Sequence, residues 1–235
     1  MQNKSPRRYG NGGIVVNKLL KIADLYDCQV PYLKELFSKY TYPWEMLGEI
    51  KGLAKELCEK GLPGFRELKP GVIIGENVTV AATATIEGPC VIGPGTEIRP
   101  GAYIRGSVIT GSNCVIGNST ELKNCILLDR VQVPHYNYVG DSVLGNHVHM
   151  GAGSICSNLK SDGKPVVIHG EEDIVTGLRK IGGLLGDEAD IGCGCVVNPG
   201  TVIGKNTSVY PLTALRGVYP ADCIVKTADT VVKRK

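Results

Sequence analysis

The sequence predicts a mainly β fold made of six-residue repeats, with a helical segment in front of it. The first observation is a period of six: from residue 72 onward an aliphatic residue recurs at every sixth position, followed four positions later by a small one. The second is the composition, because 31 glycines accompany only two Phe and one Trp, as is typical of repetitive β structure with tight turns. The third is a helical apolar spacing before residue 67.

Residues 1–66 carry the helix signals. Pro43 suits a first helical turn, and apolar residues follow it at helical spacing over residues 47–57. We also expect a short helix over residues 17–25 and another that begins near Pro31. Because the open end of a repeat array exposes unpaired backbone and apolar side chains, we expect this segment to be a helical cap on the first coil.

The period of six defines two sets of positions that we expect to point into the core. The aliphatic set is Ile74, Val80, Ile86, Ile92, Ile98, Ile104, Ile116, Leu122 and Leu128, with Thr110 in the slot once. The small set is Val78, Ala84, Cys90, Thr96, Ala102, Val108, Cys114 and Thr120. The pattern slips between residues 134 and 144, lapses over 157–184 and returns at Leu185. An array of this length defines the fold of the second part of the chain.

This pattern resembles the hexapeptide-repeat family of left-handed parallel β-helices, in which three hexapeptides form one triangular coil. The resemblance implies a mainly β domain over residues 67–235, with a loop at about 157–184. Residues eighteen apart should then stack on one face of the prism. The expected stacks are Arg105 over Lys123, Tyr103 over Glu121, and a column of Arg99, Gly117 and His135.

Composition and charge exclude several classes of protein. Lys and Arg number 26 against 23 Asp and Glu, so nucleic acid is not favoured as a partner. No early segment reads as a secretory signal, and no apolar run is long enough to span a membrane. Nine cysteines without a CxxC pair indicate reduced thiols in the cytoplasm. Four of them occupy inward slots and are expected to be buried: Cys90, Cys114, Cys156 and Cys195.

The stretch 99–164 resembles the acetyltransferase domain of the bifunctional N-acetylglucosamine-1-phosphate uridyltransferase/glucosamine-1-phosphate acetyltransferase family. The matching pieces are RPGA at 99–102, GNSTELKN at 117–124, PHYNYVGDSVLG at 134–145, GAGSICSN at 151–158, and Lys164. The resemblance implies an acetyl-CoA-dependent acetyltransferase that acts on an amino sugar phosphate or a nucleotide amino sugar. The family's nucleotidyltransferase domain has no counterpart in residues 1–66, which contain no glycine-rich phosphate loop.

The resemblance assigns roles position by position. His135 becomes the general base that takes a proton from the attacking amine or hydroxyl. Glu121 would orient this base or bind the sugar, Asn158 would position the amine, and the backbone N–H of Ala152 would face the thioester oxygen. The residues that match the family's contacts to the sugar phosphate are Arg99, Lys123, Tyr138 and Lys164. The slip at 134–144 is interpreted as the point where His135 and Tyr138 turn outward into a cleft.

Two residues depart from the family pattern and leave the sugar open. His149 stands where the relative has an asparagine that contacts the sugar, and Leu159 stands where it has a tyrosine. The resemblance also implies a homotrimer, because the family completes each active site with a neighbouring subunit.

Two other classes of function stay open at this stage. One is a zinc enzyme of the γ-carbonic anhydrase type, which has the same fold; four histidines are present, but His147 and His149 are only two residues apart, closer than that family's paired ligands. The other is a non-catalytic β-helix that binds a nucleotide sugar without turning it over. We expect no resident metal.

Overall fold

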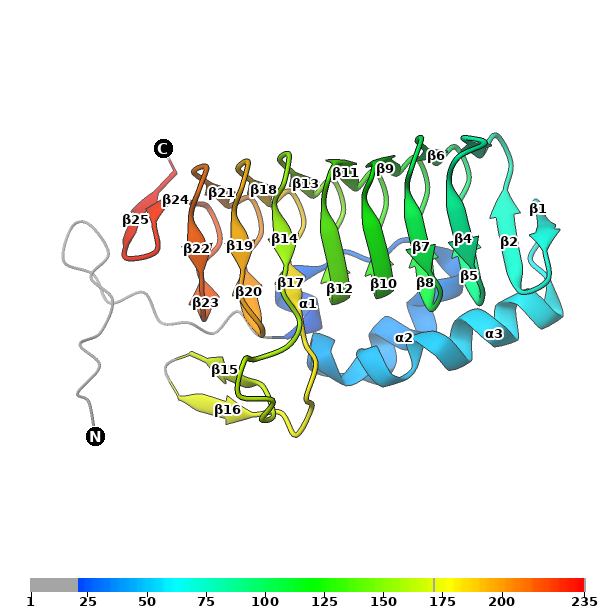
Figure 1. The fold of residues 1–235 in the computed structure, drawn as a ribbon. Coiled ribbons are helices and arrows are strands. Elements are labelled where there is room, and N and C mark those ends of the chain that lie inside the picture. The colour runs from blue at the N-terminus through cyan, green and yellow to red at the C-terminus, as the bar shows by residue number, and fades with distance from the viewer. Residues whose placement is uncertain (1–20, 171, 235) are drawn as a thin grey trace.

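The computed structural model describes residues 21–170 and 172–234. Within them the chain winds into a long prism of stacked coils, with helices lying along one side (Figure 1). The predicted left-handed parallel β-helix of hexapeptide repeats is confirmed. The part of the helix predicted over residues 17–25 that precedes Lys21 lies outside the described residues.

The strands of the described residues lie on three faces of the prism, and neighbours on a face pair in parallel. Face A contains β3 (Thr79–Val80), β6 (Glu97–Ile98), β9 (Val115–Asn118), β11 (Gln132–His135), β13 (His149–Met150), β18 (Asp190–Ile191), β21 (Ser208–Val209) and β24 (Cys223–Thr227). Face B contains β4 (Thr85–Glu87), β7 (Tyr103–Arg105), the first halves of β10 (Glu121–Leu127) and β12 (Tyr138–Leu144), β14 (Ile155–Cys156), β19 (Val196–Val197) and β22 (Ala214–Leu215). Face C contains β2 (Val72–Gly75), β5 (Cys90–Ile92), β8 (Val108–Thr110), the second halves of β10 and β12, β17 (Gly183–Leu185), β20 (Thr201–Ile203) and β23 (Val218–Tyr219).

Antiparallel hairpins adjoin both ends of the array. At the first coil β1 (Phe65–Lys69) pairs with β2, and at the last coil β25 (Thr230–Lys233) pairs with β24. Such hairpins occupy strand edges that would otherwise be free to pair with another chain.

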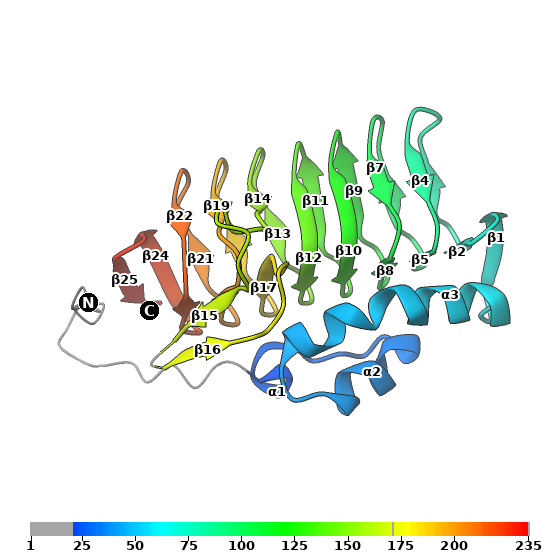
Figure 2. The same cartoon turned by 60° about the horizontal axis from the view of Figure 1, so that its bottom comes forward.

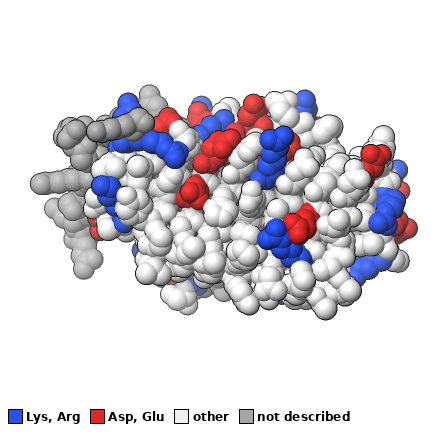
Figure 3. Space-filling model, turned by 90° about the horizontal axis from the view of Figure 1, so that it is seen from above, with Lys and Arg blue, Asp and Glu red and all other residues white. Residues whose placement is uncertain are grey.

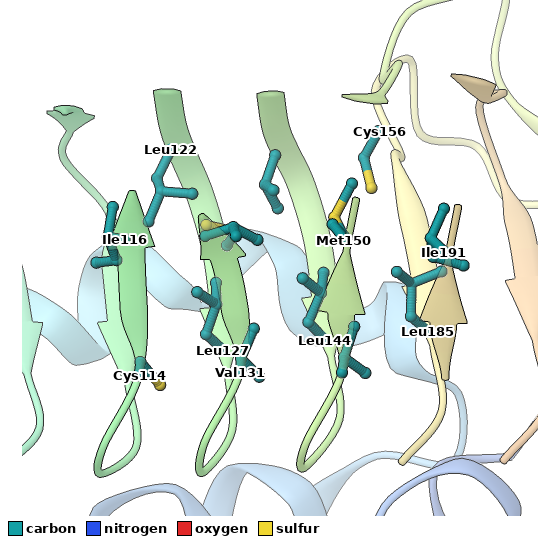
Figure 4. Packing of buried hydrophobic residues seen from close by; sticks show 14 of the residues in the cluster. Cys114, Ile116, Leu122, Leu127, Val131, Leu144, Met150, Cys156, Leu185 and Ile191 are labelled. Atoms are coloured by element: carbon teal, nitrogen blue, oxygen red, sulfur yellow. The ribbon is translucent and has the colours of Figure 1, made fainter. Parts of the chain in front are cut away.

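The inside of the prism is filled by the side chains that the period of six selects (Figure 4). Ile116, Leu122 and Met150 are each fully buried. The inward cysteines behave as small apolar residues: burial raises the pKa of the Cys114 and Cys156 thiols to about 12, so both stay neutral and unreactive near pH 7. All nine cysteines are free thiols.

The coil length changes at Asn124. Glu121 lies opposite Tyr103, eighteen residues earlier and as predicted, but Cys125 lies opposite Val108, only seventeen residues earlier. A corner of one residue, Asn124, therefore replaces the corner of two residues in the preceding coil. Asn124 adopts the left-handed conformation with φ of 48°, which asparagine tolerates better than most residues.

A second one-residue corner follows at Asp141, with φ of 47°. The predicted register is wrong between these two corners. Leu127 faces the core, and Leu128 packs outside it, against the helices. The slip thus begins at Asn124, ten residues before the predicted break.

The earlier slip also corrects one predicted column. His135 lies opposite Asn118, not opposite Gly117. Gly117 instead lies against Pro134, so closely that a Cβ atom there would collide with the Pro134 carbonyl. His135 therefore lies one position away from the column that contains Arg99.

The helices lie along face C rather than over the end of the first coil (Figure 2). They are α1 (Ile22–Leu25), α2 (Lys34–Lys39) and α3 (Ile50–Lys60), with 3₁₀ helices η1 (Pro31–Leu33) and η2 (Pro43–Gly48) between them. The start near Pro31 is confirmed. The predicted location of the cap is wrong, because α3 contacts β5, β8 and β10.

These helices pack on face C because the outward side chains of this face are apolar, like its inward side chains. The buried outward residues of this face include Ile73, Val91, Ile109, Ile126 and Val143. They form a second hydrophobic core with helical residues such as Trp44 and Ile50, and each fully buried aliphatic side chain contributes about 1.5–3 kcal/mol. The hairpin of β15 (Val167–His169) and β16 (Asp173–Val175), from the predicted loop, joins this core through Ile168. Faces A and B carry no such helical layer in the described residues.

Candidate active site

Face B brings four of the predicted site residues onto neighbouring strands. Glu121 and Lys123 flank the buried Leu122 on β10, so both side chains point outward. Tyr138 on β12 lies directly opposite Glu121, and Asn158 follows β14, the next strand of the face. The parallel register, with the seventeen-residue spacing between Glu121 and Tyr138, produces this grouping.

Three outward cations on faces A and B are paired with carboxylates. Arg105 contacts Glu121 at 2.6 Å, Lys123 contacts Asp141 at 3.2 Å, and Arg99 contacts Glu97 at 3.0 Å. Figure 3 likewise shows basic and acidic side chains lying side by side on the upper surface. A phosphate at this surface would therefore meet paired charges, not a bare cationic patch.

Asp141 lies at the centre of the face B cluster, and sequence reasoning missed its role. Its side chain is only 7% exposed and accepts hydrogen bonds from the Asn124 amide at 2.9 Å, the Lys123 ammonium at 3.2 Å and the Asn158 amide. The signal available in the sequence was its place at the slip in the repeat, directly after Gly140.

Tyr138 is held close above this carboxylate. Burial, followed by the negative charges of Asp141 and Glu121, raises the pKa of its phenol, so the hydroxyl remains a hydrogen-bond donor at physiological pH. Gly140 makes the approach possible, because a Cβ atom there would collide with the Tyr138 hydroxyl and lie 2.8 Å from the Asn158 amide nitrogen. The glycine is therefore required by the packing of the site.

His135 stands at the corner between faces A and B, at the end of β11, with an exposed side chain. Its imidazole makes no hydrogen bond or ion pair within the described part of the chain. Its backbone carbonyl accepts a hydrogen bond from Gly153 at 3.0 Å. The neighbouring Ala152 amide donates to no described residue. An imidazole and an uncommitted backbone N–H therefore lie at adjacent corners.

Asn137 fixes these two corners from inside, a second role that sequence reasoning missed. It is 2% exposed, and its side-chain carbonyl oxygen accepts a hydrogen bond from the His135 backbone N–H at 3.1 Å. Its side-chain amide donates to the carbonyl oxygens of Gly151 at 2.9 Å and Ser154 at 3.1 Å. A buried and fully satisfied asparagine of this kind fixes local geometry.

Three predicted residues lie apart from the face B cluster. Arg99 follows β6 on face A, and His149 on β13 of the same face pairs with Asp190 at 2.8 Å. Lys164 lies exposed in the loop after β14, where its backbone amide donates to Asp162. Glu121 is paired with Arg105 and makes no contact with the His135 imidazole in the described structure. One chain therefore does not bring all the predicted residues together.

Among residues 21–170 and 172–234, no group of three or more His, Cys, Asp or Glu side chains is arranged to hold a metal ion. In the same part of the chain no helix has the length and apolarity needed to cross a bilayer.

The chain is similar to several known proteins. A family model described as the GMPPB C-terminal domain matches residues 86–177. The bifunctional protein GlmU of Methanococcus aeolicus is 32% identical over 181 residues, which cover 69% of this chain and 43% of that protein. A bifunctional sugar-1-phosphate nucleotidylyltransferase/acetyltransferase of Sulfurisphaera tokodaii is 36% identical, over 62% of this chain and 36% of that protein.

Solved structures that the chain matches include AntD, an N-acyltransferase from Bacillus cereus in complex with dTDP and 3-hydroxybutyryl-CoA. It shares 18% identity over 68% of this chain and 84% of that chain, with a TM-score of 0.38. The acetyltransferase domain of PglB from Neisseria gonorrhoeae, in complex with acetyl coenzyme A, shares 16% identity over 74% of this chain and 60% of that chain, with a TM-score of 0.33.

Fold and repeat together define a hexapeptide-repeat β-helix protein. Within that class the chain is similar to the bifunctional GlmU proteins, as the sequence predicted. The chain spans about half the length of the GlmU relatives that it matches, 43% to 58% of four of them.

Proposed function

We propose that this protein is an acetyl-CoA-dependent acetyltransferase that acetylates the amine of an amino sugar phosphate or a nucleotide amino sugar. The observation that supports it most is that the exposed His135 imidazole and the Ala152 backbone N–H lie at adjacent corners. This N–H donates to no described residue. Acyl transfer to an amine needs a proton acceptor and a hydrogen-bond donor to the developing oxyanion. The relationship to proteins named as acetyltransferases adds support.

The chemistry follows from these groups. The amine nitrogen of the acceptor attacks the thioester carbon while His135 accepts a proton from that amine. The Ala152 N–H stabilises the oxyanion that forms. When the intermediate collapses, the C–S bond breaks and the protonated His135 gives its proton to the departing coenzyme A sulfur. A C–N bond has formed, a C–S bond has broken, and the imidazole is neutral again.

The face B cluster is proposed to hold the acceptor. The Tyr138 hydroxyl and the Lys123 ammonium suit phosphate or hydroxyl oxygens, and the Asn158 carbonyl suits the N–H of the amine. Because the cations are paired with carboxylates, this surface favours an acceptor that carries donors as well as a phosphate, as an amino sugar phosphate does. His149 and Lys164 are proposed to contact the sugar or its phosphate from elsewhere in the assembly.

The assembly is proposed to be a homotrimer. Arg99 and His149 lie on face A, whereas Lys123, Tyr138 and Asn158 lie on or next to face B, so one copy does not gather them. Face A of one copy beside face B of a second would bring both sets to one cleft. Light scattering should give three times 25.1 kDa at micromolar concentration, and a stable monomer would contradict the shared site.

An acceptor panel tests the proposed function. Free thiol released from acetyl-CoA is measured with amino sugars, amino sugar phosphates and nucleotide amino sugars, and the product is identified by mass spectrometry. We expect N-acetylation of one phosphorylated class. Coenzyme A binding without turnover of any acceptor would instead favour a non-catalytic module that binds nucleotide sugars.

A further inference from the structure

Asp141 is a buried carboxylate for which the proposed reaction has no direct use. It lies at the one-residue corner of the coil, 7% exposed, and it contacts two residues that we place in the acceptor site, Lys123 and Asn158. A buried carboxylate costs free energy unless every lone pair is used, and three side chains converge on this one.

The contact with Asn158 fixes which way its amide points. The two ends of an asparagine amide look alike, but an ionised carboxylate only accepts hydrogen bonds. The NH₂ group of Asn158 must therefore face Asp141, and its carbonyl oxygen must turn away from that carboxylate. This leaves an acceptor available next to Tyr138, where a donor N–H of the substrate would be recognised.

The same carboxylate limits the freedom of Lys123. The ammonium is 3.2 Å from one carboxylate oxygen and 3.4 Å from the other, so the lysine is held down against face B. Asn124 completes the arrangement: its amide donates to Asp141 at 2.9 Å and to the Leu47 carbonyl of η2 at 3.2 Å. The carboxylate is thus anchored both to the β-helix and to the helical layer on face C.

We propose that Asp141 is a positioning residue that orients Asn158, and with it the amine of the acceptor, for attack on the thioester. This rests on the proposed function and deepens it, because it assigns the residue that holds the Asn158 carbonyl ready to accept a hydrogen bond from the N–H of the acceptor amine. Asp141 touches neither substrate in this account and acts only through its neighbours.

Asp141→Asn tests the proposal, because asparagine tolerates the positive φ at this corner and keeps the shape of the side chain. The new amide can donate or accept, so Asn158 is no longer held one way round. We expect kcat for the amine acceptor to fall about 10- to 100-fold, as for a misplaced reactant, with a smaller change in its KM. A kcat within twofold of the unmodified protein would overturn the proposal.

Asp187→Asn is the matched control. Asp187 is also a buried carboxylate, at a corner between faces A and C. It contacts the Lys205 ammonium at 3.2 Å and accepts hydrogen bonds from the backbone N–H groups of Asn146 and Asp27 at 2.8 Å. It should lower the thermal midpoint as Asp141→Asn does while leaving kcat and KM unchanged. Equal kinetic losses in both variants would mean that Asp141 has only a structural role.

A double-mutant cycle with Asn158→Ala shows through which residue Asp141 acts. If Asp141 works through Asn158, adding Asp141→Asn to Asn158→Ala lowers kcat no further, whereas independent effects multiply. Multiplied losses would contradict the proposal.

An NMR measurement tests the orientation of the Asn158 amide independently of the proposed function. It does not require the Asp141→Asn variant to fold. The Asn158 side-chain NH₂ signals, assigned by their loss in Asn158→Ala, should be shifted downfield and exchange slowly in the unmodified protein. If no acceptor is acetylated, the proposed function fails, and these signals alone decide the orientation. Signals at the chemical shifts of a free asparagine amide would refute the proposed orientation of Asn158.

Discussion

Single residues explain why a solenoid of near-identical coils has one distinctive region. Exposed outward positions carry charged pairs such as Arg99 with Glu97, which in exposed settings contribute at most about 1 kcal/mol. Asn137 and Asp141 differ because they are polar and buried, and both use their hydrogen bonds to fix neighbours. The chemistry assigned to His135 and Asn158 depends on these two interior residues.

Replacement of Lys123 should affect acceptor binding more than turnover. Lys123→Ala is expected to raise the KM of a phosphorylated acceptor by about tenfold or more, because a charge-assisted contact is worth about 1.5–3 kcal/mol, and to change the KM of a neutral acceptor less. Steady-state kinetics with both acceptors provide the measurement.

Lys205→Ala provides the comparison, since Lys205 contacts buried Asp187 at the same 3.2 Å distance as Lys123 contacts Asp141. It should lose similar stability without changing either KM. An equal fold-increase in KM for the two acceptors in Lys123→Ala would remove the phosphate contact from the account.

Elements in this fold are defined by their corners, and one-residue corners set the register of the site. Asn124 carries both a left-handed backbone and two side-chain hydrogen bonds. Asn124→Ala should lower the free energy of unfolding by about 2–4 kcal/mol, from about 1 kcal/mol of backbone strain plus the groups left unpaired. Urea unfolding measures this loss.

Asn77→Ala isolates the backbone part of that loss. Asn77 has a similar φ of 58° but is exposed and makes no side-chain hydrogen bond within the described residues. It should cost only about 1 kcal/mol. Equal losses at both positions would mean that the Asn124 hydrogen bonds add nothing.

The period of six was sufficient to predict the fold, because every inward side chain obeys it up to Leu122. It was insufficient for the register beyond that point. Because this coil is one residue shorter, position 128 points outward although the period of six predicts that it points inward. Leu128 still fits the aliphatic pattern there, but it packs under the helices instead of inside the prism. Two apolar layers on face C make inward and outward positions look alike in sequence.

The site could be predicted in part for a related reason. Outward residues such as Lys123 and Tyr138 stand out against an inward pattern, and the resemblance to a known family marked them. The buried partners Asn137 and Asp141 occupy positions where a repeat normally places apolar or turn residues, so no periodic signal distinguishes them. Their roles follow only from hydrogen bonds between coils.

At the scale of the whole molecule, the helical layer stabilises face C and leaves faces A and B without a helical cover in the described residues. Ile109 on β8 is fully buried beneath this layer. Ile109→Ala should cost about 2–5 kcal/mol, as for other large-to-small changes in a core. Val175→Ala, at a site 73% exposed, should cost almost nothing.

Thermal or urea unfolding of both variants compares these costs directly. Near-equal stability of the two variants would show that the helices do not pack on face C as described. Removal of residues 1–60 exposes the apolar side chains of face C that the helices cover and should lead to aggregation. A soluble, monodisperse truncation would contradict the same packing.

The central claim is that His135 is the base of an acetyl transfer, and His135→Ala tests it most directly. Its side chain is exposed and makes no contact with other described residues, so the substitution should leave the fold and acetyl-CoA binding unchanged. We predict a loss in kcat of about 10²–10⁴-fold for the best acceptor of the panel, measured by thiol release, with the dissociation constant of acetyl-CoA within twofold. A variant that turns over at nearly the unmodified rate would contradict the account.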